Sequence, residues 1–183
     1  MLTRDSREGV TLVEILIVMA ILATLAAVLY PSVAVQLRRG QTSALANQFN
    51  YLRESIANYR QNVTKYPFTL TQLTVQPVVN GSDLCGATSL TAANVAAWRG
   101  PYLNQNIVGD IPVGDATVRN QLQRNPGTGS GQPGILQIIA DGVTLNAATD
   151  LEQQFDGNAN FGTGTVLYDG TSILTFQIPI RGC

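Results

Sequence analysis

The chain has no histidine and few charged residues. Its 183 residues include 11 lysines and arginines and 12 aspartates and glutamates, so 13% are charged and the formal net charge is −1. About 25% of residues are charged in a typical soluble domain, so part of this chain is expected to lie outside water. The absence of histidine excludes histidine-based general base catalysis, histidine-containing triads and most types of zinc site. Because basic residues are not in excess, we expect no nucleic-acid partner.

Motifs that carry chemistry are also scarce. The two cysteines, Cys85 and Cys183, lie too far apart for a CxxC metal or redox motif. The sequence contains no nucleophile–base pair, metal-ligand cluster or phosphate-binding glycine loop, so we predict that the chain is not an enzyme. Residues 156–160 (DGNAN) alternate oxygen-bearing side chains as a calcium loop does, but later positions lack the glycine and glutamate of an EF-hand. We expect a turn there, and calcium binding is the alternative.

What the sequence does contain is one long apolar run. Residues 10–30 read VTLVEILIVMAILATLAAVLY, and Glu14 is the only charged residue among them. In a helix this run spans about 30 Å, the thickness of the hydrocarbon core of a bilayer. Arg4 and Arg7 precede it and favour a cytoplasmic N-terminus. The run therefore predicts a membrane-spanning helix.

Three other interpretations of this run are weaker. A secretory signal peptide could end at residues 32–34 (SVA), but its apolar region usually has about 7–15 residues. A plain anchor gains nothing from a carboxylate that costs roughly 2.5–3.5 kcal/mol at the centre of a bilayer. A buried helix of a soluble protein is seldom apolar on all sides. Glu14 therefore needs a partner, and cleavage after Gly9 would create one, a largely cationic amine on Val10.

The N-terminal segment resembles a known processing motif. Residues 9–14 (GVTLVE) followed by the apolar run are similar to the prepilin motif of type IV pilins and of the pseudopilins of type II secretion. The usual motif has Phe or Met after the glycine, so Val10 is a departure from it. The resemblance implies that a prepilin peptidase cleaves between Gly9 and Val10 and that Val10 is then N-methylated. It also implies that Glu14 neutralises the Val10 amine of a neighbouring subunit during filament assembly.

This resemblance predicts the organisation of the chain. We expect a leader at residues 1–9, a transmembrane and filament-core helix at 10–30, a helical spine at 31–65 and a loop-rich β head at 66–183. The predicted function is a structural subunit of a type IV pilus-like filament, held in the inner membrane by a single span with its head outside the cytoplasm. The filament would lie at the cell surface or in the periplasm.

The resemblance also implies partners and a disulfide. The expected partners are further copies of the chain, related pilins, the prepilin peptidase, the inner membrane and its assembly platform. A pseudopilin of a type II secretion system is one alternative, and a minor pilin whose head binds a surface ligand or DNA is another. Because the head would lie in an oxidising compartment, we expect a disulfide between Cys85 and Cys183, as in pilins with a C-terminal bridge.

An apolar stripe indicates how the helical spine packs. Six apolar residues recur at alternating spacings of four and three, which is typical of one buried helix face. They are Leu45, Phe49, Leu52, Ile56, Tyr59 and Val63. We predict one helix over residues 10–63, interrupted at Pro31 and Gly40 and ended by the proline of Tyr66-Pro67.

The strand patterns come late in the chain. Residues 135–140 and 164–168 are β-rich, and Asp169-Gly170 predicts a two-residue hairpin into residues 171–180. A helix that packs against a small antiparallel sheet gives an α+β fold. Three weaker patterns predict further elements. They are helices near 91–98 and 115–124 and a strand near 143–145. Trp98 is expected to pack over the helix stripe, with a role as a surface anchor as the alternative.

Overall fold

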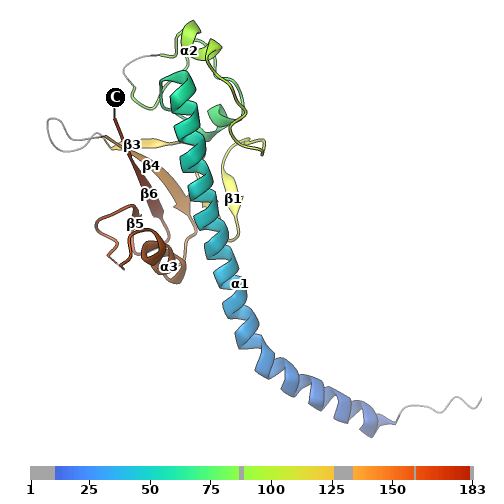
Figure 1. Ribbon diagram of the computed structural model, residues 1–183. Helices are drawn as coiled ribbons and strands as arrows, with labels where there is room; N and C mark the ends of the chain where they lie inside the picture. Colours follow the sequence, from blue (N-terminus) through green and yellow to red (C-terminus); the bar gives the residue numbers. More distant parts are fainter. Residues whose placement is uncertain (1–10, 87–88, 126–133, 159, 182–183) are drawn as a thin grey trace, which may run out of the picture. The chain divides into compact units, whose positions relative to one another are not determined.

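A computed structural model describes residues 11–86, 89–125, 134–158 and 160–181. The chain divides into two compact units, Met1–Arg39 and Gly40–Cys183. Helix α1 (Leu12–Val63) continues through Pro31 and Gly40, so the predicted interruptions are wrong (Figure 1). A proline removes one backbone hydrogen bond, and a glycine costs about 1 kcal/mol relative to alanine. The helix keeps its backbone hydrogen bonds on both sides of Pro31 and Gly40, so the bond lost at Pro31 and the cost of Gly40 do not interrupt it.

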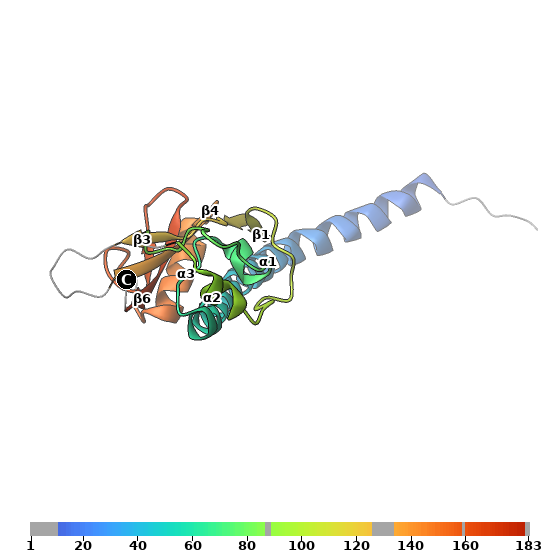
Figure 2. The same cartoon turned by 90° about the horizontal axis from the view of Figure 1, so that it is seen from above.

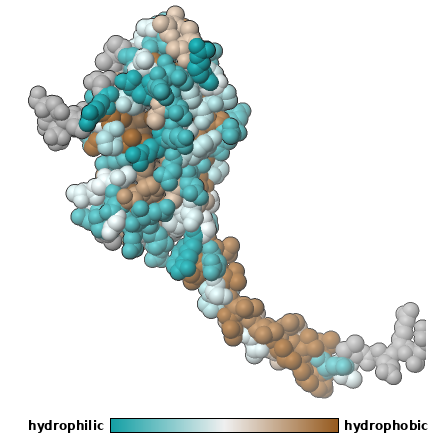
Figure 3. Space-filling model, in the orientation of Figure 1, coloured by the Kyte–Doolittle hydropathy of each residue, from teal (hydrophilic) through white to brown (hydrophobic). Residues whose placement is uncertain are grey.

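In the first unit, the helix exposes apolar side chains on all sides. The face that Figure 3 shows is largely brown, the colour of hydrophobic residues. Within the described residues, α1 is the one helix that is long and apolar enough to cross a membrane. The hydroxyls of Thr24 and Ser32 donate to the carbonyls of Ile21 and Leu29, both at 2.8 Å. These hydroxyls therefore need no water, which suits a helix in lipid.

In the second unit, the C-terminal half of α1 forms one wall of the core. All six residues of the predicted stripe are buried, which confirms the prediction. Phe49 stacks on Phe176 of the sheet with ring centroids 4.9 Å apart and planes 5° apart. Phe155 meets the same Phe176 ring nearly edge-on at 5.0 Å. The Phe176 side chain of the sheet thus contacts α1 through Phe49 and a second helix through Phe155. The predicted packing of helix against sheet in an α+β fold is confirmed.

The described residues form one antiparallel sheet of six strands. The strands are β1 (Ile111–Val113), β2 (Ala116–Val118), β3 (Gln123–Asn125), β4 (Gly134–Asp141), β5 (Val166–Tyr168) and β6 (Leu174–Ile180). Their order is β1-β2-β4-β6-β5, and β3 pairs with the opposite end of β4 from β2. The longest pair, β4 with β6, runs in register from Gly134↔Ile180 to Ala140↔Leu174. The late strands predicted from the sequence are therefore present as β4 and β6 in the interior of the sheet and as β5 at one edge.

Two of the weaker predictions are wrong. Residues 115–124 form β2 and β3 rather than a helix, because pairing with β4 outweighs their local preference. The strand predicted near 143–145 is the start of helix α3 (Leu145–Phe155). Thr144 is the N-cap of α3, since its hydroxyl accepts the amide hydrogen of Ala147 at 3.4 Å.

The predicted helix near 91–98 is confirmed in shorter form as α2 (Ala92–Ala96). A capping box between Thr91 and Asn94 begins this helix. The Asn94 side chain also donates to the carbonyl of Val63 at 2.9 Å, which fixes α2 beside the end of α1 (Figure 2). A short 3₁₀ helix, η1 (Leu70–Leu73), follows the exit of α1.

The hairpin between β5 and β6 is present, but its turn is longer than predicted. Five residues, 169–173, join the two strands. The Asp169 carboxylate accepts amide hydrogens from Thr171 at 2.8 Å, Ser172 at 3.0 Å and Ile173 at 2.9 Å. Hydrogen bonding to the Thr171 side chain and to these amides lowers the pKa of Asp169. An Asp turn of this kind is stabilised by its side chain, which the two-residue pattern did not predict.

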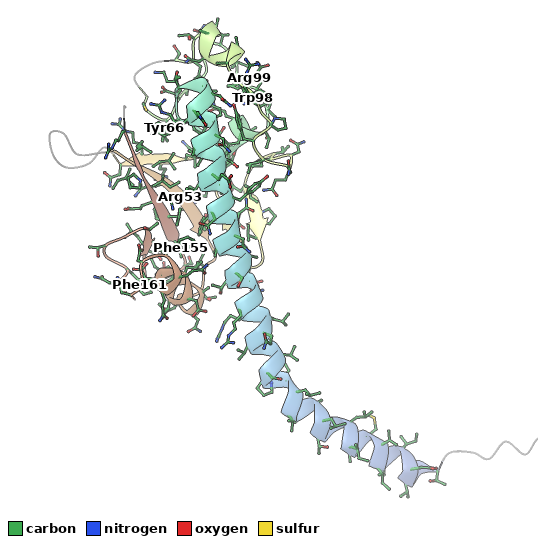
Figure 4. All side chains as sticks on the ribbon, viewed as in Figure 1. Arg53, Tyr66, Trp98, Arg99, Phe155 and Phe161 are labelled. Atoms are coloured by element: carbon green, nitrogen blue, oxygen red, sulfur yellow. The ribbon has the colours of Figure 1, made fainter. Side chains whose placement is uncertain are left out.

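Trp98 packs within the head, as expected. Its indole Nε1 donates to the carbonyl of Gln72 at 3.1 Å. Its ring meets the Tyr102 ring edge-on, with centroids 5.8 Å apart. Trp98 itself is labelled in Figure 4. Trp98 is therefore half-buried against the core, and both its ring and its Nε1 group contact other residues of the head.

Candidate functional site

The candidate site lies at the first turn of α1. Because α1 begins at Leu12, Thr11 is its N-cap residue and Glu14 is the third helical residue. The Glu14 amide donates to the Thr11 hydroxyl at 3.3 Å, and the Thr11 amide donates to Glu14 Oε2 at 3.4 Å. The Thr11 hydroxyl lies 3.5 Å from the same carboxylate oxygen. This reciprocal pair is a capping box, which satisfies two amides that a helix leaves without partners.

The capping box gives Glu14 a local role that the sequence analysis missed. A carboxylate in the first turn is also favoured by the positive end of the helix dipole. The signal was present in the sequence, because Thr-x-x-Glu before an apolar run is a capping-box pattern. Capping of the helix is therefore sufficient by itself to explain a glutamate at position 14. A role of Glu14 in assembly has to be tested against this simpler role.

The geometry leaves Glu14 able to take a second partner. Its side chain is exposed, and among the described residues its Oε1 atom accepts no hydrogen bond. An ionised carboxylate has about four acceptor positions, so the long bonds from Thr11 occupy only part of its capacity. Gly9 and Val10 lie outside the described residues, so cleavage between them, methylation of Val10 and the pairing of its amine with Glu14 stay predictions.

A family model of the prokaryotic N-terminal methylation motif matches residues 4–30. The chain therefore carries the prepilin-type signature of type IV pilins and pseudopilins. The match covers most of the predicted leader, the predicted cleavage position and the apolar part of α1. Comparison with curated proteins and with solved structures found no match to the chain.

The structure places the region around Cys85 next to the end of α1. Cys85 is disulfide-bonded and lies in a turn two residues after Asp83, whose Oδ2 atom lies 3.4 Å from Lys65 Nζ. The hydroxyl of Tyr66 lies 3.3 Å from both the amide and the carbonyl oxygen of Arg181. Lys65 thus contacts Asp83, which is two residues from Cys85 in the sequence. Tyr66 contacts Arg181, which is two residues from Cys183 in the sequence. Cys183 itself lies outside the described residues, so its pairing with Cys85 stays a prediction.

The segment considered for calcium is a loop between α3 and β5. The Asp156 carboxylate accepts the amide hydrogens of Thr165 and Val166, and the Asn158 and Asn160 side-chain oxygens also accept loop amides. In the described part of the chain, no group of three or more acidic or cysteine side chains is placed to hold a metal. These oxygens are engaged by the loop backbone, and calcium binding there stays a prediction.

Glu152 is a buried carboxylate on α3 that the sequence analysis did not identify. It is fully buried, and neither of its oxygens has a hydrogen-bond partner among the described residues. Burial raises the pKa of Glu152, the negative charge of Asp156 raises it further, and the nearby backbone amide of Asn160 lowers it in part, so the pKa is raised on balance. Since the folded pKa exceeds the unfolded one, the folded state binds more protons between the two values. The free energy of unfolding therefore falls as the pH rises through this window.

We predict that Glu152→Met stabilises the head. Methionine has a similar volume and needs no proton or partner, so the free energy of unfolding at neutral pH should rise by about 1–3 kcal/mol. The gain should be smaller near pH 5, where Glu152 carries its proton more often. Urea unfolding of the full chain in detergent, followed by the fluorescence of its single tryptophan, measures this difference. The exposed Glu54→Met is the control, and equal effects of the two variants would contradict the prediction.

Proposed function

We propose that this chain is a structural subunit of a type IV pilus-like filament, held in the inner membrane and polymerised through the first half of α1. The observation that carries the proposal is the methylation motif over residues 4–30, on a helix whose apolar side chains are exposed. Each large apolar side chain that stays in water lacks the roughly 1.5–3 kcal/mol of stabilisation that burial gives, so this surface should be buried against lipid or protein. Lipid surrounds the first half of α1 before assembly, and the helices of other subunits pack against it afterwards.

Glu14 is proposed to set the register of assembly. Cleavage after Gly9 creates an amine at Val10, and a charged group is costly in an apolar filament core unless it is paired. A subunit whose amine meets the Glu14 carboxylate of its neighbour avoids that cost, whereas a subunit in another register does not. The same polar pair would thus select one helix stagger, a role that buried polar groups also have in coiled coils.

The proposed partners follow from this role. They are the prepilin peptidase, the assembly platform, other copies of this chain and related pilins. A pseudopilus of type II secretion would use the same N-terminal chemistry. The disulfide at Cys85, beside a helix exit that also contacts Arg181, favours a pilus subunit with a bridged C-terminal region. The prepilin-type signature points to a structural protein rather than an enzyme.

Processing can be tested directly. Co-expression with a prepilin peptidase should remove residues 1–9 from the wild-type chain, because Gly9 is the residue before the predicted scissile bond. Gly9→Leu should block removal, with processing slowed more than about tenfold, a loss of at least ~1.4 kcal/mol of transition-state stabilisation. Intact mass measurement after a fixed time reads out both forms.

Gly40→Ala is the matched control for this test. It changes another glycine of the chain, at a position where an added Cβ meets nothing within 4 Å. It should be processed as well as the wild type. Equal processing of Gly9→Leu, or a cut after Ala34, would contradict the proposal.

A further inference from the structure

A groove of about 400 Å³ lies in the head between α1 and the end of β6. One wall runs along α1 from Arg53 to the end of the helix and on to Thr64, and the other is formed by Tyr66 and residues 178–180. Figure 3 shows brown apolar atoms among teal ones on this side of the head. At 1.5 Å per helical residue, the α1 wall is about 16 Å long. The groove is therefore elongated, with an apolar floor that includes Ile56 and Ile180.

Two arginines line this groove without an acidic partner. Arg53 and Arg60 lie on the same face of α1, and no carboxylate lines the groove. In the described part of the chain, the ion pairs are Lys65–Asp83 and Arg119–Asp141, so neither groove arginine is paired. The Arg60 guanidinium carbon lies 5.1 Å from the centre of the Tyr66 ring, a contact that positions the charge without using its N–H donors. The groove is thus positive in a chain whose net charge is −1.

The exposed edge of β6 cannot pair with another strand in the ordinary way. Strand β5 pairs with residues 174–176, and the amide of Gln177 donates to the carbonyl of Thr165 at 2.6 Å. Backbone groups of alternate residues face the same edge of a strand, so the next position facing this edge is Pro179. Proline has no amide hydrogen to donate. An occupant of the groove must therefore be held mainly by side-chain contacts.

We propose that this groove binds an extended peptide segment of a partner protein in which acidic and apolar side chains alternate. About five extended residues span the 16 Å wall, at roughly 3.3 Å per residue. Side chains on one face of the segment would fill the apolar floor, and carboxylates on the other face would reach Arg53 and Arg60. A small anion would leave the floor uncovered, and a flat membrane surface would not enter a groove. This inference does not depend on filament assembly.

The test uses a fluorescein-labelled peptide of sequence EIEIE and the purified full-length chain in nonionic detergent. Fluorescence polarisation should show saturable binding that weakens as salt is added, because exposed charges are screened. The double variant Arg53→Gln, Arg60→Gln should bind at least about tenfold more weakly, since charge-assisted hydrogen bonds are lost. Arg99→Gln removes an arginine outside the groove (labelled in Figure 4) and should bind as the wild type does.

Two further measurements separate the apolar contribution from the charge. Ala57→Trp fills the groove without changing its charge and should also reduce binding at least about tenfold. The peptide ESESE, which has the charges without the apolar side chains, should bind clearly more weakly than EIEIE. Equal binding of EIEIE to the wild type and the double arginine variant would overturn the proposal. Displacement of the peptide by millimolar inorganic phosphate would overturn it too, because it would identify a small-anion site.

Discussion

Glu14→Gln is expected to be cleaved and to fold normally, yet to enter filaments at least about tenfold less efficiently, a difference of ~1.4 kcal/mol or more. Glutamine at the third helical position can maintain a capping box, so the helix start is kept. The charge that would pair with the Val10 amine of a neighbouring subunit is lost. The ratio of sheared filament to membrane-held subunit, measured by immunoblotting in the native host, gives the effect.

Thr11→Val is the matched control for Glu14→Gln. It removes the hydroxyl at the N-cap, which costs about 1 kcal/mol of helix stability, and keeps the carboxylate charge. If Glu14 acts in assembly, this variant should enter filaments nearly as well as the wild type. If Glu14 only caps the helix, the order should reverse, with Thr11→Val impaired and Glu14→Gln close to normal.

Cys85→Ser is expected to lower the free energy of unfolding of the head by up to about 4.7 kcal/mol. This is the chain-entropy value for a loop of roughly 100 residues, which a bridge from Cys85 to Cys183 would close. The native contacts of Lys65 with Asp83 and of Tyr66 with Arg181 remain after the substitution, so the folded head should keep its structure. The loss should come mainly from the greater freedom of the unfolded chain. Urea unfolding of the variant and the wild type measures it.

Reduction and thiol labelling provide the controls for the disulfide. Dithiothreitol should destabilise the wild type as much as Cys85→Ser does, and it should not destabilise the variant further. Cys183 should react with maleimide in Cys85→Ser without reduction, and in the wild type only after reduction. Equal labelling of the two unreduced proteins would contradict the bridge.

The long helix and the centre of the sheet were predictable because their signals are local. Burial of the stripe from Leu45 to Val63 follows from its three-and-four spacing. Strands β4 and β6 are β-rich runs bounded by turn residues. The apolar run containing Glu14 is long and almost uncharged. In each case the pattern repeats over enough residues to outweigh other preferences.

The parts that were missed depend on contacts between distant residues or on single side chains. Residues 116–118 and 123–125 are strands because β4 lies beside them, and no local pattern specifies that pairing. Helix α3 was missed although Thr144 is a regular N-cap signal. The groove joins residues 53–64 to residues 178–180, which are far apart in the sequence.

At the candidate site itself, the sequence indicated Glu14 but not its hydrogen bonds with Thr11. Glu14 was identified from its charge in an apolar run, and its expected partner was the Val10 amine. Its hydrogen bonds with Thr11 match a Thr-x-x-Glu pattern in the sequence, but they form because α1 begins at Leu12. A capping box depends on where the helix starts, and helix boundaries vary by one or two residues even between assignments from coordinates.

The most direct test of the account is the mass of the N-terminal peptide of the protein purified from its native membrane. The account predicts a peptide that begins at Val10 and carries one added methyl group. A peptide that begins after Ala34, or an intact N-terminus at Met1, would contradict it. In the first case the apolar run would be a secretory signal, and in the second a plain anchor, and neither leaves a free Val10 amine for Glu14 to bind.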